Sequence, residues 1–507
     1  MNILQQQLTH WQRVQPAHHA LEGQSRSGDP VAIPYGQLNS MCRATARLWD
    51  KQSRVIAMMC DNTPDTILLD IAMMAANIST VPIPPFFTPQ QTQHLLRQAG
   101  VEIIITDDPE RIEGLLQQIG ITIVTTQREE GCCVSLHAYH IDNPTDKQQS
   151  HFDKITFTSG STGNPKGVCL GNRALLTVAE SLQQATEANR EDRHLALLPY
   201  ATLLESIGGI LVPLLAGATI IHPTLARVGM SGSSSLDSAT MVKALQHYRA
   251  SSCIMVPQML LALTTYLTAN PEERPEHLRF VAVGGATISP ALLTRAQELG
   301  IAVFEGYGLS EAASVVAVNT PSAHKIGSVG KPLPHVELRT DSDGELWVKG
   351  ALMEGYLDNG VTTMSAKDSD GFWPTGDIGA VDSSGFLHIT GRKKQIFITA
   401  FGRNVAPEWV ERELTIEPEI AQAALFGDGK PFNVAVVVAR NPQTVHNAIE
   451  RANSRLPDYA KVTRFILANE PFSITNRQAA INGSPHRAEI ARAYQQEIAR
   501  CYSKEKR

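Results

Sequence analysis

The sequence predicts an α/β protein with a large N-terminal domain of mainly parallel sheets covered by helices, an antiparallel subdomain, and a small mobile α+β C-terminal domain. Strand-like and helix-like segments alternate through the first two thirds of the chain, as in parallel sheets with helices on their faces. Near residue 335 the pattern changes to short strand-like runs separated by Asp, Ser and Gly turns. Because 507 residues are too many for one ordinary core, we expect two domains, residues 1–393 and 394–507.

The elements of the first part follow in a regular order. The first predicted strands are 54–60 and 101–106, and the first predicted helices are 64–76 and 90–99. Further along, the predicted strands are 155–157 and 280–283, and the predicted helices are 174–188 and 258–267. The most apolar stretch, 207–221, is shorter than a membrane span and contains glycines and a proline, so we expect a buried helix-to-strand passage.

The last third combines antiparallel strands with a separate α+β pattern. The strands expected in the antiparallel subdomain are 336–339, 345–349 and 386–390. Beyond the charged segment 391–394, Pro407 opens a helix that extends to residue 414. Residues 421–426 and 433–439 then look like paired strands, and 444–453 look like a helix.

The composition excludes several classes of function. With 43% hydrophobic and 19% charged residues, the chain is typical of a soluble globular protein. Its net charge of −6, without a long basic run, argues against nucleic acid or a membrane as a main partner. Seven scattered cysteines without a CxxC pair indicate reduced thiols in a cytoplasmic protein. Residues 1–16 are rich in Gln and lack the apolar core of a signal peptide.

The most informative stretch is residues 158–167, Thr-Ser-Gly-Ser-Thr-Gly-Asn-Pro-Lys-Gly, which follows a short apolar run. Three glycines allow bare backbone N–H groups to turn inward: Gly160, Gly163 and Gly167. Four residues add hydroxyl donors: Thr158, Ser159, Ser161 and Thr162. Lys166 adds a point charge, so the loop is suited to a polyphosphate. It is not a P-loop, because Pro165 precedes the lysine and a glycine follows it.

This loop resembles the phosphate loop of the AMP-forming adenylating superfamily, which includes acyl-CoA synthetases, peptide-synthetase adenylation domains and luciferases. Further similar motifs follow downstream in the family's order, and the resemblance covers almost the whole chain. It looks closest to long-chain fatty acyl-CoA synthetases. The resemblance implies a large domain with a small mobile C-terminal lid, and ATP, Mg²⁺ and CoA or a phosphopantetheine carrier protein as cofactors.

A second motif, Tyr307-Gly308-Leu309-Ser310-Glu311, is similar to the family's Tyr-Gly-x-Thr-Glu. The resemblance implies that Glu311 holds Mg²⁺, that Ser310 contacts the α-phosphate and that Tyr307 packs against adenine. A carboxylate suits Mg²⁺, which prefers hard oxygen ligands. The alternative reading is a glycine-rich turn with helix-capping residues.

Two weaker motifs complete the expected nucleotide site. Asp377, in Thr375-Gly376-Asp377, matches the family aspartate that accepts hydrogen bonds from the ribose hydroxyls. Gly284-Gly285-Ala286 resembles the family's glycine-rich bend along the adenine plane. Each motif read alone is also ordinary turn chemistry.

The boundary segment carries the expected lid residues. Arg392 aligns with the family arginine that contacts the nucleotide, and Lys394 with the hinge residue. Gly402 matches the glycine beside which pantetheine passes, where a side chain would block the path. Lys166, Ser310, Glu311 and Arg392 are therefore the predicted catalytic residues.

The acyl group of the substrate is expected to bind deeper in the N-terminal domain than the nucleotide. Residues 199–205 correspond to the family's Pro-Leu-x-His-x-x-Glu, with Thr202 at the histidine position. Residues 227–256 are expected to border the acyl pocket, and helix 258–267 either walls a lipid chain or belongs to the ordinary core.

One position departs from the family pattern. Most relatives carry a lysine near the C-terminus that bridges the substrate carboxylate and the α-phosphate, and Ser484 stands there in this chain. Arg487 or His486 could substitute, or the protein could use a supplied adenylate.

The leading hypothesis is therefore an ATP-dependent ligase that activates a small carboxylic acid, favoured as fatty or lipid-like, and transfers it to CoA or an acyl carrier protein. An aryl-acid or polyketide-pathway ligase is the alternative enzyme. A nucleotide- or acyl-binding accessory protein with impaired adenylation is the alternative outside catalysis.

Overall fold

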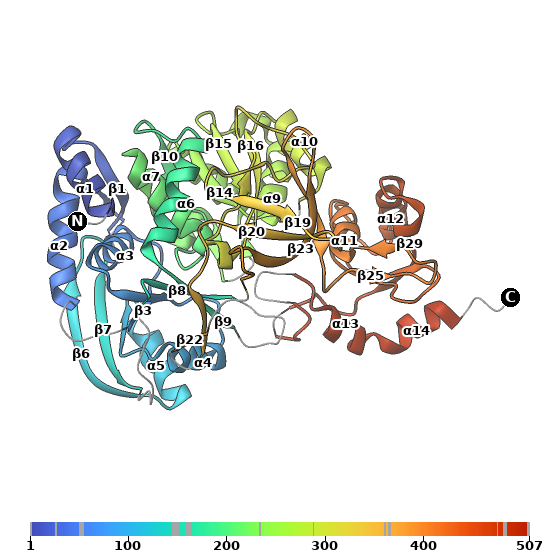
Figure 1. The fold of residues 1–507 in the computed structure, drawn as a ribbon, viewed down its shortest axis with the longest axis horizontal. Coiled ribbons are helices and arrows are strands. Elements are labelled where there is room, and N and C mark those ends of the chain that lie inside the picture. The colour runs from blue at the N-terminus through green and yellow to red at the C-terminus, as the bar shows by residue number, and fades with distance from the viewer. Residues whose placement is uncertain are drawn as a thin grey trace.

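The structure is a computed structural model that describes residues 3–25, 28–49, 55–143, 152–158, 165–232, 235–286, 288–358, 361–363, 367–473, 475–479 and 484–503. Its N-terminal part stacks two large sheets with helices between them and on both outer faces (Figure 1). Three hydrophobic cores separate these layers, which gives the α/β arrangement that the sequence predicts.

The first sheet has nine strands in the order β18-β17-β16-β15-β14-β10-β11-β1-β2. The strands from β16 to β1 in this order are parallel, and both edges are antiparallel. Its strands are β1 His19–Gln24, β2 Pro30–Pro34, β10 Arg193–Leu195, β11 Thr219–Ile221, β14 Ser252–Met255, β15 Phe280–Val283, β16 Val303–Tyr307, β17 Ala317–Val318 and β18 Lys331–Pro332.

The second sheet also has nine strands, in the order β22-β21-β9-β8-β4-β3-β5-β7-β6. Only its centre, from β8 to β5, is parallel, so long antiparallel flanks accompany the expected parallel core. Its strands are β3 Val55–Met59, β4 Ser79–Pro82, β5 Ile103–Thr106, β6 Thr122–Glu130, β7 Ser135–Asp142, β8 Lys154–Thr158, β9 Lys166–Leu170, β21 Gly355–Asp358 and β22 Val361–Thr363.

Helices fill the layers between and outside these sheets. The inner layer contains α3 Pro64–Ala76, α6 Asn172–Ala185, the π-helix η1 Glu205–Leu211 and α7 Val212–Ala216, with α1 Ile3–Val14 and α2 Tyr35–Trp49 beside them. The outer helices are α4 Pro89–Ala99 and α5 Pro109–Ile119 on the second sheet, and α8 Ser238–His247, α9 Pro257–Ala269 and α10 Pro290–Glu298 on the first. Helix α3 is buried along most of its length because it lies between two sheets.

The antiparallel subdomain is a four-stranded sheet in the order β19-β20-β23-β24. Its strands are β19 Glu337–Thr340, β20 Glu345–Lys349, β23 Trp373–Val381 and β24 Leu387–Arg392. The C-terminal part has its own two small cores around the sheet β27-β28-β29. Its elements are β25 Phe397–Ile398, β26 Asn404–Val405, α11 Pro407–Thr415, β27 Ile420–Phe426, β28 Asn433–Ala439, α12 Val445–Ser454, β29 Val462–Leu467, α13 Arg487–Ala493 and α14 Gln495–Ser503.

Most predicted elements are present, and several have the predicted bounds, such as the helix 64–76 and the strands 280–283, 345–349 and 433–439. The predicted end of the helix over 174–188 was wrong. Helix α6 ends at Ala185, because Glu187 adopts a left-handed backbone conformation with φ 54°. The apolar stretch 207–221 is the buried passage expected, formed by η1, α7 and β11. Among the described helices, none combines the length and apolarity needed to cross a membrane.

Candidate nucleotide and acyl site

The predicted motifs meet where the parallel strands of the first sheet end. Residues at the ends of β15 and β16 lie there, beside the β8–β9 hairpin of the second sheet and the antiparallel sheet. A cavity of about 490 Å³ opens at this place, a size typical of small-molecule pockets. Its lining is mostly apolar and includes Thr158, the bend 284–286, Tyr307 and Ser310.

Lys166 and Glu311 are linked by a third residue that the sequence reasoning missed. The Lys166 ammonium lies 5.4 Å from the centre of the Tyr356 ring, and the Tyr356 hydroxyl donates to Glu311 Oε1 at 2.5 Å. Tyr356 pairs with Val168 across β21 and β9, which places it beside the start of β9. The contact between Tyr356 and Lys166 can be recognised only from this strand pairing, because no local sequence pattern connects the two residues.

Glu311 is suited to a hard cation. It is half-buried, and a carboxylate retains acceptor capacity after one hydrogen bond. Within the described residues, no three His, Cys, Asp or Glu side chains form a complete metal cage. A single carboxylate agrees with Mg²⁺, which takes one or two protein ligands and obtains the others from phosphates and water.

A second group joins Tyr307, Asp377 and Arg392. The Tyr307 hydroxyl donates to Asp377 Oδ2 at 2.5 Å, and Arg392 Nε lies 2.7 Å from Asp377 Oδ1. Asp377 and Arg392 face each other across β23 and β24, so the strand register produces the ion pair. Burial raises the pKa of Asp377 above its ordinary value, although Arg392 and Tyr307 act in the opposite direction.

The glycines at this end of the sheet are required by close packing. A Cβ on Gly284 would lie 3.2 Å from the Gly306 carbonyl oxygen, and Gly285 has φ 80°. A Cβ on Gly308 would overlap the Ser314 carbonyl oxygen. These three glycines and Ala286 line the cavity.

Part of the predicted phosphate loop lies outside the described residues: Ser159, Gly160, Ser161, Thr162, Gly163 and Asn164. Its two ends are described. Thr158 ends β8, Lys166 begins β9, and the two residues pair directly across the hairpin. The loop therefore begins at Thr158, which lines the cavity, and ends beside it at the paired Lys166.

The residues predicted for the lid, Lys394 and Gly402, do not line the cavity. Gly402 occupies an exposed turn with φ 71°, and its N–H donates to the Thr399 carbonyl at 2.9 Å. Neither Gly402 nor Lys394 is among the residues that line the cavity. In this arrangement Arg392 is the residue of the boundary segment that joins the Asp377 group.

Ser484 lies in a segment that is held within the C-terminal part. It is half-buried and comes shortly before α13. Arg487, one of the possible substitutes for the missing lysine, forms two bonds to Glu411, with Nε 2.8 Å from Oε1, and donates from Nη1 to Gln395. Its charge is therefore committed inside the lid in this arrangement.

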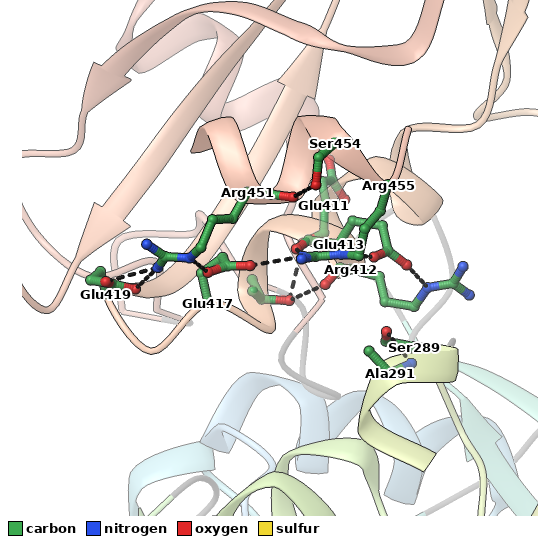
Figure 2. Close-up of polar contacts among 11 residues, drawn as sticks. Ser289, Ala291, Glu411, Arg412, Glu413, Glu417, Glu419, Arg451, Ser454 and Arg455 are labelled. Atoms are coloured by element: carbon green, nitrogen blue, oxygen red, sulfur yellow. Dashed lines mark hydrogen bonds and ion pairs between the residues drawn. The ribbon is translucent and has the colours of Figure 1, made fainter. Parts of the chain in front are cut away.

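Arg412 of the C-terminal part lies near a buried carboxyl group of the N-terminal part. Burial raises the pKa of Glu305, on β16, to about 8, and the charge of Arg412, on α11, acts in the opposite direction. Figure 2 shows Arg412 within a layer of acidic and arginine side chains above Ser289 and Ala291 at the start of α10. The neighbouring pairs are tight, with Arg451 Nε 2.6 Å from Glu417 and Arg455 Nε 2.9 Å from Glu413, whereas Arg412 Nε lies 3.6 Å from Glu413.

Comparison with known proteins agrees with this geometry. A family model described as AMP-binding enzyme matches residues 8–357, and one described as AMP-binding enzyme C-terminal domain matches residues 394–506. The chain belongs to the AMP-binding enzyme family. This membership confirms the resemblance drawn from the loop 158–167 and the later motifs.

Individual relatives match with different coverage. The long-chain-fatty-acid–CoA ligase FadD15 of Mycobacterium bovis is 41% identical over 204 residues, which are 40% of this chain and 33% of that protein. The 2-succinylbenzoate–CoA ligase of Bacillus pumilus is 27% identical over 77% of this chain and 78% of its own length. The matched region thus spans about a third of the first relative and most of the second.

Solved structures confirm the fold. The anthranilate CoA ligase AuaEII, in complex with anthranoyl-AMP, superposes with a TM-score of 0.77 and 15% sequence identity, covering 98% of both chains. At this identity the similarity concerns the fold alone, including the presence of the C-terminal part.

Proposed function

We propose that the protein is an AMP-forming ligase that activates a carboxylic acid with ATP and transfers the acyl group to a pantetheine thiol. In the first half-reaction the carboxylate oxygen bonds to the α-phosphorus and pyrophosphate leaves. In the second, the thiol sulfur bonds to the acyl carbon, the thiol proton is lost, and AMP leaves. CoA and a carrier protein are both candidate donors of the thiol.

The observation that carries this proposal is that two polar groups lie beside residues that line one apolar cavity, namely Thr158, Tyr307 and Ser310. Lys166 and Glu311 meet through Tyr356, and Asp377 is held between Tyr307 and Arg392. The first group provides a cation and a carboxylate, as polyphosphate and Mg²⁺ require. The apolar cavity behind them suits the body of an organic acid and excludes water from a reactive anhydride.

We assign the residues to roles accordingly. Lys166 and the hydroxyls around Thr158 position the phosphates, and Ser310 contacts the α-phosphate. Glu311 holds Mg²⁺, which when bound neutralises phosphate charge. Asp377 accepts from the ribose, since each carboxylate oxygen has a second lone pair beyond those used by Tyr307 and Arg392. Tyr307 and the bend 284–286 flank the adenine.

The domain organisation is part of the proposal. We assign residues 1–393 to the nucleotide- and acyl-binding domain and residues 394–507 to the lid, with Lys394 as the hinge. The separate cores of the C-terminal part support this division. Rotation about the hinge would bring Gly402 to the cavity for thiol transfer. The seven free cysteines support a cytoplasmic location.

A fatty or lipid-like acid is favoured over an aryl acid. The cavity lining is largely aliphatic, and the more similar of the two relatives above is named for long-chain fatty acids. The aryl alternative is supported by the 2-succinylbenzoate ligase, which matches over more of its length.

A second candidate function is binding without efficient adenylation. Ser484 replaces the expected lysine, and Arg487 is paired with Glu411. Acid-dependent exchange of labelled pyrophosphate into ATP, measured with a panel of alkanoic and aryl acids, separates the two candidates. Exchange that depends on the identity of the acid supports the ligase. Calorimetric binding of ATP without exchange with any acid supports the accessory protein.

A further inference from the structure

The cavity extends deep along the first sheet. Its lining includes Gly284 and Val256 at the carboxyl ends of the strands and reaches Ser252, Phe280 and Asp192 at their amino ends. Ser252 pairs with Phe280 across β14 and β15, so both lie at the same depth. The cavity therefore follows the strands for most of their length.

A paired charge cluster lines the cavity at the amino ends of the strands. Arg279 Nε lies 2.6 Å from Asp192 Oδ1, and Arg279 Nη1 donates to the Thr186 carbonyl at 3.1 Å. Hydrogen bonds hold the pKa of Asp192 below its ordinary value although burial alone would raise it. These charges satisfy each other, so the cluster does not require a charged ligand.

Most other polar side chains in the deep half are also engaged. The Thr186 hydroxyl donates to the Leu182 carbonyl at 2.8 Å. Both ring nitrogens of His194 have partners, with Nε2 3.2 Å from Glu205 Oε1 and Nδ1 3.0 Å from Ser252 Oγ. Ser252 is half-buried and lines the cavity, and a serine hydroxyl can make up to three hydrogen bonds.

The direction in which the Ser252 hydroxyl proton points depends on the hydrogen-bonded pair of His194 and Glu205. If Glu205 is ionised and His194 is neutral, Glu205 accepts from Nε2, Nδ1 accepts a hydrogen bond from the serine hydroxyl, and serine lone pairs face the cavity. If Glu205 is protonated, it donates to Nε2, Nδ1 donates to Ser252, and the serine proton faces the cavity. A ligand hydroxyl can pair with Ser252 in both states, because it both donates and accepts.

We propose that the cavity selects an acid that carries a hydroxyl on its chain, recognised by Ser252, with His194 as the positioning residue that orients the serine. This inference rests on the proposed function and adds the substrate class. Ser252 lies three residues before Met255, whose carbonyl accepts from the Gly284 N–H at 3.3 Å. Three residues of strand span about 10 Å. A staggered carbon chain advances roughly 1.3 Å per bond, so the hydroxyl lies about eight to ten carbons from the carboxyl group.

The test compares matched acids in pyrophosphate exchange: octanoic against 8-hydroxyoctanoic acid, and decanoic against 10-hydroxydecanoic acid. We expect kcat/KM to be about tenfold higher for the hydroxy acid of one pair, because its hydroxyl adds a hydrogen bond to Ser252 that the plain chain cannot make. Ser252→Ala should remove this preference by lowering kcat/KM for the hydroxy acid to that of the plain acid. Ser252→Thr should retain it, and His194→Gln should weaken it through KM more than kcat.

The matched control is Ser181→Ala. Ser181 also bonds a histidine, with its Oγ 2.8 Å from His335 Nδ1, but does not line the cavity, so the preference should persist. Equal kcat/KM for plain and hydroxy acids in the wild-type protein would overturn the inference and leave the ligase intact. If no acid supports exchange, the proposed function fails. Calorimetry of the same acids then decides the inference, with about tenfold tighter binding of the hydroxy acid supporting it and equal affinity overturning it.

Discussion

At the scale of single residues, Lys166 combines exposure with a fixed position. It begins β9, and its ammonium lies over the Tyr356 ring, so a cation–π contact holds the charge near Glu311. In the proposed site, a cation fixed at this place would stabilise developing phosphate charge, because it would need no reorganisation during the reaction.

Replacing this lysine tests its role. For Lys166→Ala we expect kcat/KM for ATP in pyrophosphate exchange to fall on the order of 100-fold, with an unchanged melting temperature because the side chain is exposed. The matched control is Lys430→Ala in the lid, whose ammonium lies 5.3 Å from the Tyr502 ring centre. Equal rate losses in the two variants would contradict a specific role for Lys166.

Glu305 gives a prediction about pH. Burial raises its pKa in the folded protein to about 8, above the ordinary value of 4.5. The folded state therefore holds this proton more tightly, so the contribution to stability is complete below about pH 4.5 and is lost as the pH rises to about 8. Glu305→Gln cannot lose a proton. Its melting temperature relative to the wild type should rise between pH 5 and pH 8, and a constant difference would show that Glu305 does not titrate in this range.

At the scale of elements, a buried ion pair ties the second sheet to the helices of the inner layer. Lys154 on β8 lies with its Nζ 2.8 Å from Asp70 of α3 and 2.9 Å from the Ser206 hydroxyl of η1. Both charged side chains are about 95% buried. This contact fixes the start of the strand that leads to the phosphate loop.

Breaking the Lys154–Asp70 ion pair should lower the free energy of unfolding. Lys154→Met leaves Asp70 buried without its cation, so we expect a loss of about 3–5 kcal/mol in unfolding free energy, measured by urea denaturation. The double variant Lys154→Met with Asp70→Leu should recover much of this loss, since both charges are removed together. An exposed pair provides the control: Lys325→Met, beside Asp382, should change stability far less. Similar losses in the two single variants would contradict the importance of burial.

At the scale of the whole molecule, the proposed site needs groups from the C-terminal part that do not line the cavity in this structure. Neither Arg487 nor Gly402 is among the lining residues. In the proposed function, rotation of the C-terminal part about the segment near Lys394 would bring the region of Ser484 to the site.

Restoring the expected lysine tests this rotation. Ser484→Lys should raise the rate of pyrophosphate exchange about tenfold or more, because a mobile ammonium would bridge the carboxylate and the α-phosphate. Ser484→Met adds similar length without charge and should give no gain. Absence of a gain with lysine would show that this segment does not dock at the site.

The sequence by itself determined the alternation of elements and the family, and it predicted a set of site residues. Local signals were sufficient where an element has its own cap: Thr63, Pro64 and Asn77 set both ends of α3. The motif around Lys166 was noticed from its glycines, hydroxyls and lysine, whereas Glu311 and Asp377 were predicted from the resemblance to the family's motifs. The antiparallel flanks of the sheets were not predicted, since strand direction depends on pairing between distant segments.

Only the tertiary structure decided which distant residues meet. Tyr356 reaches Glu311 because β21 pairs with β9, and His194 reaches Glu205 and Ser252 because a π-helix and two neighbouring strands converge. Glu305 of β16 and Arg412 of α11 lie close enough for each to influence the pKa of the other, although they come from different parts of the chain. Each of these contacts depends on strand register or domain packing, which bring together residues far apart in the chain, and no local pattern records that proximity.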